Sequence, residues 1–201
     1  GIRRAYIYIE NVDRVPDMTD QEKAIGKAEA KVIIAYHYSQ MLRYYGGMPW
    51  IDHAYTAEDE MKFPRMTLEQ TVEKIVDLLD EAADTLPWEV DADNDGHLTK
   101  AAAIALKSRV LLFAASPLFN ADEPYLQGDA SAQFITWYGN YSADRWQKAL
   151  DAGLQFMREN NGRYKLVNTG NPREDFAAGY FNRHNGEVLI SSRRFTTYMT
   201  G

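Results

Sequence analysis

The sequence of 201 residues contains no cysteine. This absence excludes disulfides, thiolate nucleophiles and any zinc site built on cysteine. Histidine is scarce as well, and no two histidines are spaced i, i+4. Neither a zinc site nor a catalytic triad is therefore predicted. The four histidines are His37, His53, His97 and His184.

Long apolar runs and basic clusters are also missing. No apolar stretch approaches the ~20 residues needed to span a bilayer. The net charge is −7, and Lys and Arg are scattered along the chain. An acidic surface repels phosphate backbones, so nucleic-acid binding is not predicted. The chain opens at Gly1 directly in a helical pattern and stops at Gly201 just after a strand-like run, so we expect a segment of a longer protein.

Aromatic residues are abundant, at 12% of the chain, with 13 Tyr and 4 Trp. An aromatic ring can stack on the apolar face of a sugar, and it can equally fill a protein core. The hydrophobic content of 45% is enough for one good core and a second small lobe.

Apolar residues at helical spacing, set between start and stop signals, predict five helices. Thr19 with Glu22 and Thr67 with Gln70 form capping boxes at two of the starts. Gly46 and the residues after it end the second helix. The predicted helices span 1–10, 19–45, 67–86, 99–116 and 142–162.

The second predicted helix is apolar on two faces, which indicates that it packs between other helices. We predict a mainly α fold of stacked antiparallel helical hairpins, a TPR-like α-α superhelix with a short C-terminal β element. The expected organisation is a helical core over 1–163 and a truncated, irregular β segment over 164–201. Within that segment we expect an extended piece at 164–167, one or two helical turns at 175–181 and a strand at 187–192.

Two connections are long, 49–66 and 117–141. Loops of this length are usually functional or disordered. The second connection has too many aromatics for a disordered linker, so we expect an ordered loop. Those aromatics are Phe119, Tyr125, Phe134, Trp137, Tyr138 and Tyr141.

Candidate ligand-binding residues lie in these loops. Trp50 follows the glycine turn, and Trp137 and Tyr138 have Asn120 and Asp122 nearby as hydrogen-bonding groups for sugar hydroxyls. The alternative is that Trp50 and Trp137 anchor their loops onto the helices.

Acidic motifs offer weaker candidates. Asp91, Asp93 and Asp95 copy the first half of an EF-hand calcium loop, but position 12 is Ala102, where calcium needs a bidentate Glu. We therefore predict an acidic turn and no metal site. The carboxylates of the third helix (Asp77, Asp80, Glu81 and Asp84) are typical of a solvated face.

Short motifs across nearly the whole chain occur in the order found in the SusD/RagB family, which the chain resembles. That family has a Gly-Glu-Ala-Arg-type helix and an aromatic-rich turn ending in Gly-Gly-x-Pro. Lys27 and Ala28 stand where the family more often runs straight from Gly to Glu, and Lys31 replaces the usual Arg. The fold expectation does not depend on these positions. The similar stretches are GKAEAK at 26–31, AYHY at 35–38, LRYYGGMP at 42–49, PRMT at 64–67, IVDLL at 75–79, KAAAIALKSRV at 100–110, ASPLFN at 115–120 and NGEVLI at 185–190.

The resemblance implies a SusD-like α-α superhelix on the cell surface, held at the outer membrane by a lipid anchor outside this chain. It also implies a SusC-like TonB-dependent transporter as partner, to which a captured oligosaccharide or peptide is delivered. Family members are commonly more than twice this long, so part of the ligand site is expected in flanking segments.

We therefore predict a non-catalytic glycan-binding protein without a cofactor. One alternative is a TPR-like scaffold that binds only protein, which requires a concave groove lined by exposed polar and aromatic helix positions. A second is an all-helical glycoside hydrolase, which requires two carboxylates about 5–10 Å apart in a cleft.

Overall fold

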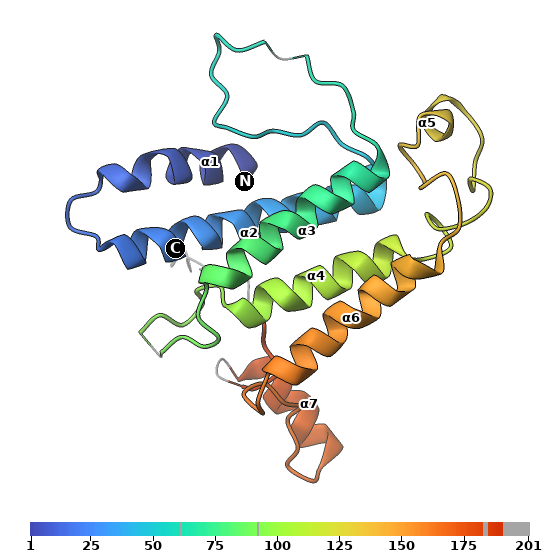
Figure 1. The fold of residues 1–201 in the computed structure, drawn as a ribbon. Helices are drawn as coiled ribbons and strands as arrows, with labels where there is room; N and C mark the ends of the chain where they lie inside the picture. Colours follow the sequence, from blue (N-terminus) through green and yellow to red (C-terminus); the bar gives the residue numbers. More distant parts are fainter. Residues whose placement is uncertain (61, 92, 183–184, 191–201) are drawn as a thin grey trace, which may run out of the picture.

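The computed structural model describes residues 1–60, 62–91, 93–182 and 185–190. It is mainly helical, as predicted, and each of the five expected helices is present (Figure 1). A short helix, α5, lies within the second long loop, and the turns expected at 175–181 extend into α7. The helices are α1 (Ile2–Asn11), a 3-10 turn (Val12–Arg14), α2 (Asp20–Tyr45), α3 (Leu68–Thr85), α4 (Lys100–Ala114), α5 (Asp129–Ala132), α6 (Ala143–Glu159) and α7 (Pro172–Phe181).

Both predicted capping boxes are confirmed. The Thr19 hydroxyl accepts from the backbone N–H of Glu22 at 3.2 Å, and the Thr67 hydroxyl accepts from that of Gln70 at 3.2 Å. The Glu22 and Gln70 side chains in turn accept from the cap backbone N–H groups. These bonds satisfy donors that the first turn of a helix leaves unpaired, and they fix where α2 and α3 begin.

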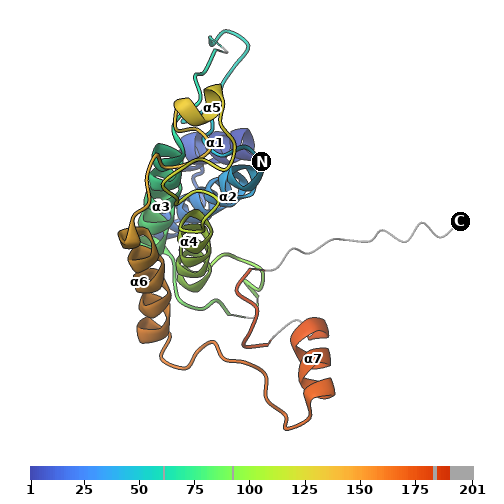
Figure 2. The same ribbon diagram turned by 90° about the vertical axis from the view of Figure 1, so that its right-hand side faces the viewer.

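The long helices form two layers. In chain order, α1 packs on α2, α2 on α3, α3 on α4 and α4 on α6. Seen from the side, α3 and α6 lie in one layer and α2 and α4 in the other (Figure 2). α2, α3 and α4 each therefore pack between two other long helices, which confirms the predicted stack of helical hairpins and the two-sided burial of α2.

A single apolar core runs through this stack. Ala101, Ala102 and Ala103 at the start of α4 are 0% exposed, so small side chains allow close helix contact there, as their run predicts. The largest fully buried side chains are Tyr38, Ile34, Leu42, Leu68, Ile75, Leu79 and Ile104.

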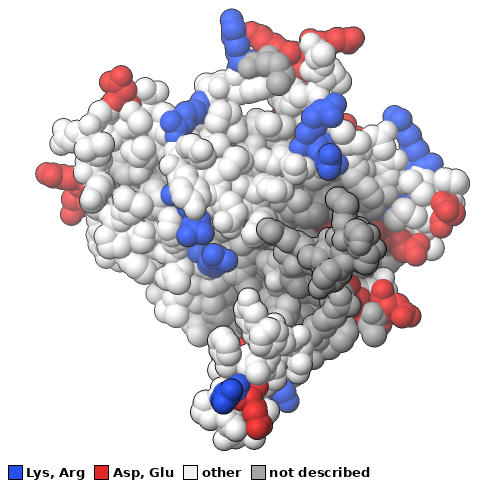
Figure 3. Space-filling view, turned by 180° about the vertical axis from the view of Figure 1, so that it is seen from behind, with Lys and Arg blue, Asp and Glu red and all other residues white. Residues whose placement is uncertain are grey.

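On one face of the molecule, basic and acidic side chains lie in different places. Seen from behind, Lys and Arg are scattered over the middle of the face and acidic side chains lie mainly toward its edges (Figure 3).

On α6, Ala149 and Ala152 are buried against the stack. The side chains of Trp146, Leu150, Leu154 and Met157 are exposed on the same helix, so α6 has apolar groups on its solvent side.

The segment after α6 is the least regular part. The backbone N–H of Lys165 donates to the carbonyl of Gly186 at 3.0 Å, which joins the predicted extended piece to the turn. α7 has no buried residue and packs on no other described helix (Figure 2). Residues 187–190 form a turn and a bend, where a strand was expected, and 191–192 lie outside the described residues. A strand requires a ladder of such bonds with a neighbour. The division at residue 163 stays a prediction.

Within the described residues, no helix combines the length and apolarity that crossing a membrane requires.

Candidate ligand-binding surface

The two long loops meet at one end of the helical stack. The backbone N–H of Gly47 donates to the carbonyl of Ile135 at 2.7 Å, and that of Leu68 donates to the carbonyl of Phe134 at 2.9 Å. These bonds bring the connection 49–66, which rises above the stack, against the base of the connection that contains α5 (Figure 1). The two long loops are therefore joined at their bases.

The glycine pair is required by this junction. Gly46 has φ +69°, and a Cβ there would overlap the carbonyl oxygen of Ile135. A Cβ at Gly47 would likewise overlap the backbone of Met66 and Thr67. The Arg65 guanidinium donates to the carbonyls of Gly47, at 2.9 Å, and Tyr45, and so satisfies acceptors that the end of α2 leaves free.

Trp50, a predicted binding residue, is packed against the helical core. Its ring stacks on that of Tyr38, with centroids 4.1 Å apart and planes at 15°. The Tyr38 hydroxyl accepts from the N–H of Ile51 at 2.7 Å and donates to the carbonyl of Pro49 at 3.3 Å. This is the geometry of the anchoring alternative, because one face of the indole is covered and the loop is pinned on both sides of it. A ligand contact by Trp50 stays a prediction.

The Asn120 side chain links the second loop to α6 through hydrogen bonds. It is only 3% exposed. Its side-chain carbonyl accepts from the N–H of Ser142 and from Arg145, each at 2.8 Å, and its amide donates to the carbonyl of Ser142 at 2.9 Å. Contact between Asn120 and a sugar would require these hydrogen bonds to Ser142 and Arg145 to break.

Asp122 and Trp137 are nearer the solvent. The Asp122 carboxylate is exposed and accepts from the N–H of Tyr141 at 3.4 Å. The Trp137 indole is half-buried, donates to the carbonyl of Ser131 at 2.9 Å and lies 6.3 Å from the ring of Phe134. The loop therefore has a small core of its own, and part of the Trp137 ring stays accessible.

Tyr138 lies where this loop meets the helices. The Arg145 guanidinium is centred 3.9 Å from its ring, a close cation–π contact. Burial raises the pKa of the Tyr138 phenol to about 12; Arg145 opposes this shift, and the carboxylates of Glu69 and Glu73 add to it. The shift leaves Tyr138 neutral at physiological pH, as an ordinary tyrosine is, so its hydroxyl can donate a hydrogen bond.

An aromatic cluster in the first loop was missed from the sequence. The Tyr55 ring stacks on His53 at 3.8 Å between centroids and meets Phe63 edge-on at 4.8 Å. The Tyr55 carbonyl accepts from Arg3 on α1 at 2.7 Å, so the cluster is fixed to the helices. The spacing of His53 and Tyr55 is a usable signal, but the approach of Phe63 depends on how the loop folds back.

Two carboxylates border this aromatic cluster. Asp52 is 2.7 Å from the Nδ1 of His53, and this hydrogen bond is the main cause of the lowered pKa of Asp52. Asp59 accepts from the backbone N–H of Thr56 at 2.6 Å, which lowers the pKa of Asp59 in the same way. Both groups are therefore ionised acceptors beside exposed ring surface, a combination suited to hydroxyl donors.

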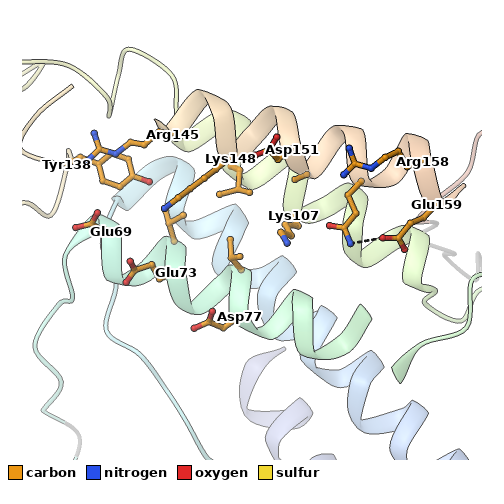
Figure 4. Close-up of a pocket in the computed structure, with 15 residues that line it drawn as sticks. Glu69, Glu73, Asp77, Lys107, Tyr138, Arg145, Lys148, Asp151, Arg158 and Glu159 are labelled. Atoms are coloured by element: carbon orange, nitrogen blue, oxygen red, sulfur yellow. Dashed lines mark hydrogen bonds between the residues drawn. The ribbon is translucent and has the colours of Figure 1, made fainter. Parts of the chain in front are cut away.

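A groove of about 610 Å³ lies between α3 and α6, with α4 as its floor (Figure 4). Tyr138 and Arg145 stand at one end of it. The charged residues on its α3 side are carboxylates, and its α6 side carries Arg145, Lys148 and Arg158 together with Asp151 and Glu159.

The acidic segment before α4 forms a turn. The Asp91 side chain accepts from the backbone N–H of Asn94 at 2.9 Å, and the N–H of His97 donates to the carbonyl of Asn94 at 3.1 Å. His97 and the N–H of Leu98 also contact the Glu29 carboxylate, at 3.0 and 2.6 Å. No group of three or more acidic or histidine side chains with metal-binding geometry occurs among the described residues.

Comparison with solved structures shows that the chain shares its fold with SusD-like proteins. A SusD-like protein from Bacteroides fragilis NCTC 9343 is 22% identical with a TM-score of 0.73, over 96% of this chain and 32% of that one. The protein BT4246 is 28% identical with a TM-score of 0.71, over 82% and 30%. A laminarin-binding SusD-like protein is 19% identical with a TM-score of 0.65, over 92% and 34%.

The chain thus spans about a third of the length of these structures. A search of curated proteins finds no match. The SusD-like family model described as "Starch-binding associating with outer membrane" matches residues 1–112, which include α1 to α3 and most of α4. With this match and the shared fold, the chain belongs to the SusD-like family of carbohydrate-binding proteins.

Proposed function

We propose that this chain is part of a non-catalytic cell-surface protein that captures a glycan and delivers it to a TonB-dependent transporter of the outer membrane. Membership of a family described as starch-binding and associated with the outer membrane supports the ligand class and the location. The family resemblance supports a SusC-like transporter as partner and a lipid anchor outside these residues.

The observation that carries glycan binding is the ordered aromatic cluster at the loop end. His53, Tyr55 and Phe63 form a connected aromatic surface beside the ionised Asp52. A pyranose offers an apolar face to such rings and hydroxyl donors to such a carboxylate. Long loops on a rigid scaffold are a usual place for recognition residues.

The second loop completes this surface in our proposal. Trp137, Tyr138 and Asp122 provide further stacking and hydrogen-bonding groups, Trp50 holds the first loop against the core, and Asn120 holds the second loop against α6. Two loops joined at their bases can contact one oligosaccharide from both sides.

The test is calorimetric titration of the full-length protein with a panel of oligosaccharides, with parallel measurement of released sugar. We expect saturable binding of at least one glycan without release. Tyr55→Ala should lower that affinity roughly tenfold. The size is taken from nucleic-acid bases stacked on aromatic side chains, where removing the ring costs about 1–3 kcal/mol of binding free energy. Tyr180→Ala is the matched control, because Tyr180 is 75% exposed on α7, outside both loops.

Two results would oppose the proposal. Release of sugar by the purified protein would favour the glycoside hydrolase alternative. Equal affinity in the Tyr55→Ala and Tyr180→Ala variants, with both folded, would remove the first loop from the binding surface. Delivery needs a cellular test, in which deletion of the transporter should stop uptake of the glycan while the cells still bind it.

A further inference from the structure

The groove between α3 and α6 is lined by charged side chains that capture of a neutral sugar would leave unpaired. Its floor and lower walls are apolar, formed by Val72, Val76, Leu111 and Ala152. Its upper walls are charged, and the two walls have opposite signs (Figure 4). The α3 and α6 helices do not pack on each other directly, because α4 holds them apart. The groove is thus a fixed property of the stack.

The α3 wall is acidic. Glu69, Glu73 and Asp77 line the α3 side of the groove, at positions i, i+4 and i+8 of one helix (Figure 4). A helix rises ~1.5 Å per residue, so successive carboxylates are about 6 Å apart along the wall. All three side chains are exposed, and none forms an ion pair or hydrogen bond with another described residue.

The α6 wall is mainly basic. Lys148 and Arg158 line the groove, are exposed and form no ion pair or hydrogen bond within the part of the chain that the structure describes. Arg145 lies at the end of the same wall, already bonded to Asn120 and Asn140. Two acidic groups, Asp151 and Glu159, lie on the same wall. Asp151 accepts from Gln147 at 2.8 Å, and Glu159 is 3.5 Å from the ammonium of Lys100. The floor cation, Lys107, is paired with Asp80 at 2.6 Å.

We propose that this groove binds an extended peptide segment in which basic and acidic residues alternate. Successive side chains of an extended strand point to opposite sides, and those on one side repeat every ~6.7 Å. This repeat matches the spacing of about 6 Å between the α3 carboxylates. Basic side chains of the peptide would face Glu69, Glu73 and Asp77, and acidic ones would face Lys148 and Arg158.

The charge pattern favours a peptide over a sugar. A neutral glycan leaves both charged walls unpaired. An acidic glycan meets Lys148 and Arg158 but is repelled by the three carboxylates opposite. A polypeptide is a linear polymer that can carry opposite charges on its two sides. Glu69 to Asp77 covers about 12 Å, the length of about four or five extended residues.

The groove also has the features expected of a protein-binding helical scaffold, namely exposed polar helix positions and an aromatic, Tyr138, at its end. Peptide binding here would accompany glycan capture at the loop surface and would not require a bound glycan. Because the charges are exposed, we expect rapid association that weakens as salt concentration rises.

The experiment uses the full-length protein and a fluorescent peptide of alternating Lys and Glu, followed by anisotropy at low and at physiological salt. We expect saturable binding that Glu73→Lys weakens roughly tenfold. The double variant Glu73→Lys with Lys148→Glu should weaken binding further, because each wall then carries one charge that repels the peptide side facing it. Asp84→Lys is the matched control, an exposed carboxylate of α3 outside the groove.

Three outcomes would overturn the proposal. Oligolysine binding as tightly as the alternating peptide would show attraction to net negative charge alone. An equal loss with Asp84→Lys would show the same. An acidic oligosaccharide that displaces the peptide and binds more tightly to the Glu73→Lys variant would assign the groove to a glycan. Circular dichroism would verify that each variant folds, and Glu73→Gln replaces Glu73→Lys if the reversal does not.

Discussion

The backbone N–H of Gly47 donates to the carbonyl oxygen of Ile135 at 2.7 Å, so the end of α2 is joined directly to the second long loop. The two residues are far apart in sequence, yet this bond sets the distance between the two loops proposed to bind glycan. Substitutions that disturb it should therefore affect stability and binding together.

Gly46→Ala should destabilise the protein by more than about 1 kcal/mol, because alanine disfavours positive φ and its Cβ would overlap the Ile135 carbonyl. Gly162→Ala is the matched control, since Gly162 also has positive φ (+75°) but nothing within 4 Å of a Cβ. Urea unfolding measures both. Equal losses would show that the clash with Ile135 is unimportant.

Tyr38→Phe should cost about 1–3 kcal/mol of unfolding free energy, because the N–H of Ile51 loses its acceptor beside a core residue that is 1% exposed. The Trp50 ring keeps its stacking partner, so the change isolates the hydroxyl. Tyr36→Phe on the same helix is the control, because Tyr36 is 40% exposed and its hydroxyl has no hydrogen bond with a described residue. An unchanged free energy of unfolding in Tyr38→Phe would show that the Tyr38 hydroxyl does not hold the loop against the core.

Tyr138 should make stability depend on pH in the alkaline range. Its pKa in the folded protein is about 12, above the ordinary value of 10.0, so folding favours the protonated phenol. This contribution is complete below pH about 10 and declines as the pH rises toward 12. Denaturant unfolding at several pH values should show this decline, and Tyr138→Phe should reduce it. Tyr6, also raised to about 12, accounts for part of what remains.

Trp137→Ala should lower glycan affinity several-fold while shifting the melting temperature little, if the accessible part of the ring stacks on sugar. The indole also donates to Ser131, so the melting temperature decides between the two roles. Trp137→Phe, which removes that donor but keeps an aromatic ring, separates them further. A large melting shift with unchanged affinity would mean that Trp137 only anchors its loop.

Most of the helical fold could be predicted from the sequence because its signals are local. The hydroxyl of Thr67 and its partner Gln70 are three residues apart, and the apolar stripe of α3 repeats within the helix itself. The strand expected at 187–192 had only a turn and an apolar run in its favour. A strand also needs a neighbour, which no local pattern can provide, and 187–190 form a turn and a bend.

The candidate site was less predictable because it depends on contacts between distant segments. Asn120 looked like a solvent-exposed hydrogen-bonding residue, yet Ser142 and Arg145 enclose it. The opposite walls of the groove come from α3 and α6, and the regular spacing of Glu69, Glu73 and Asp77 on the helix reads equally well as a solvated face. Only the arrangement of the helices shows what lies across from them.

Arg145 has a consequence for how the two proposed surfaces influence each other. Its guanidinium is bonded to Asn120 and Asn140 and lies over Tyr138, so its side-chain rotamer is already fixed. Fixing an arginine side chain costs up to about 2 kcal/mol of conformational entropy. A ligand that reaches Arg145 does not meet this cost again. A ligand that pulls it away breaks the hydrogen bonds to Asn120 and Asn140, so binding in the proposed groove site should be thermodynamically linked to order in the loop proposed to bind glycan.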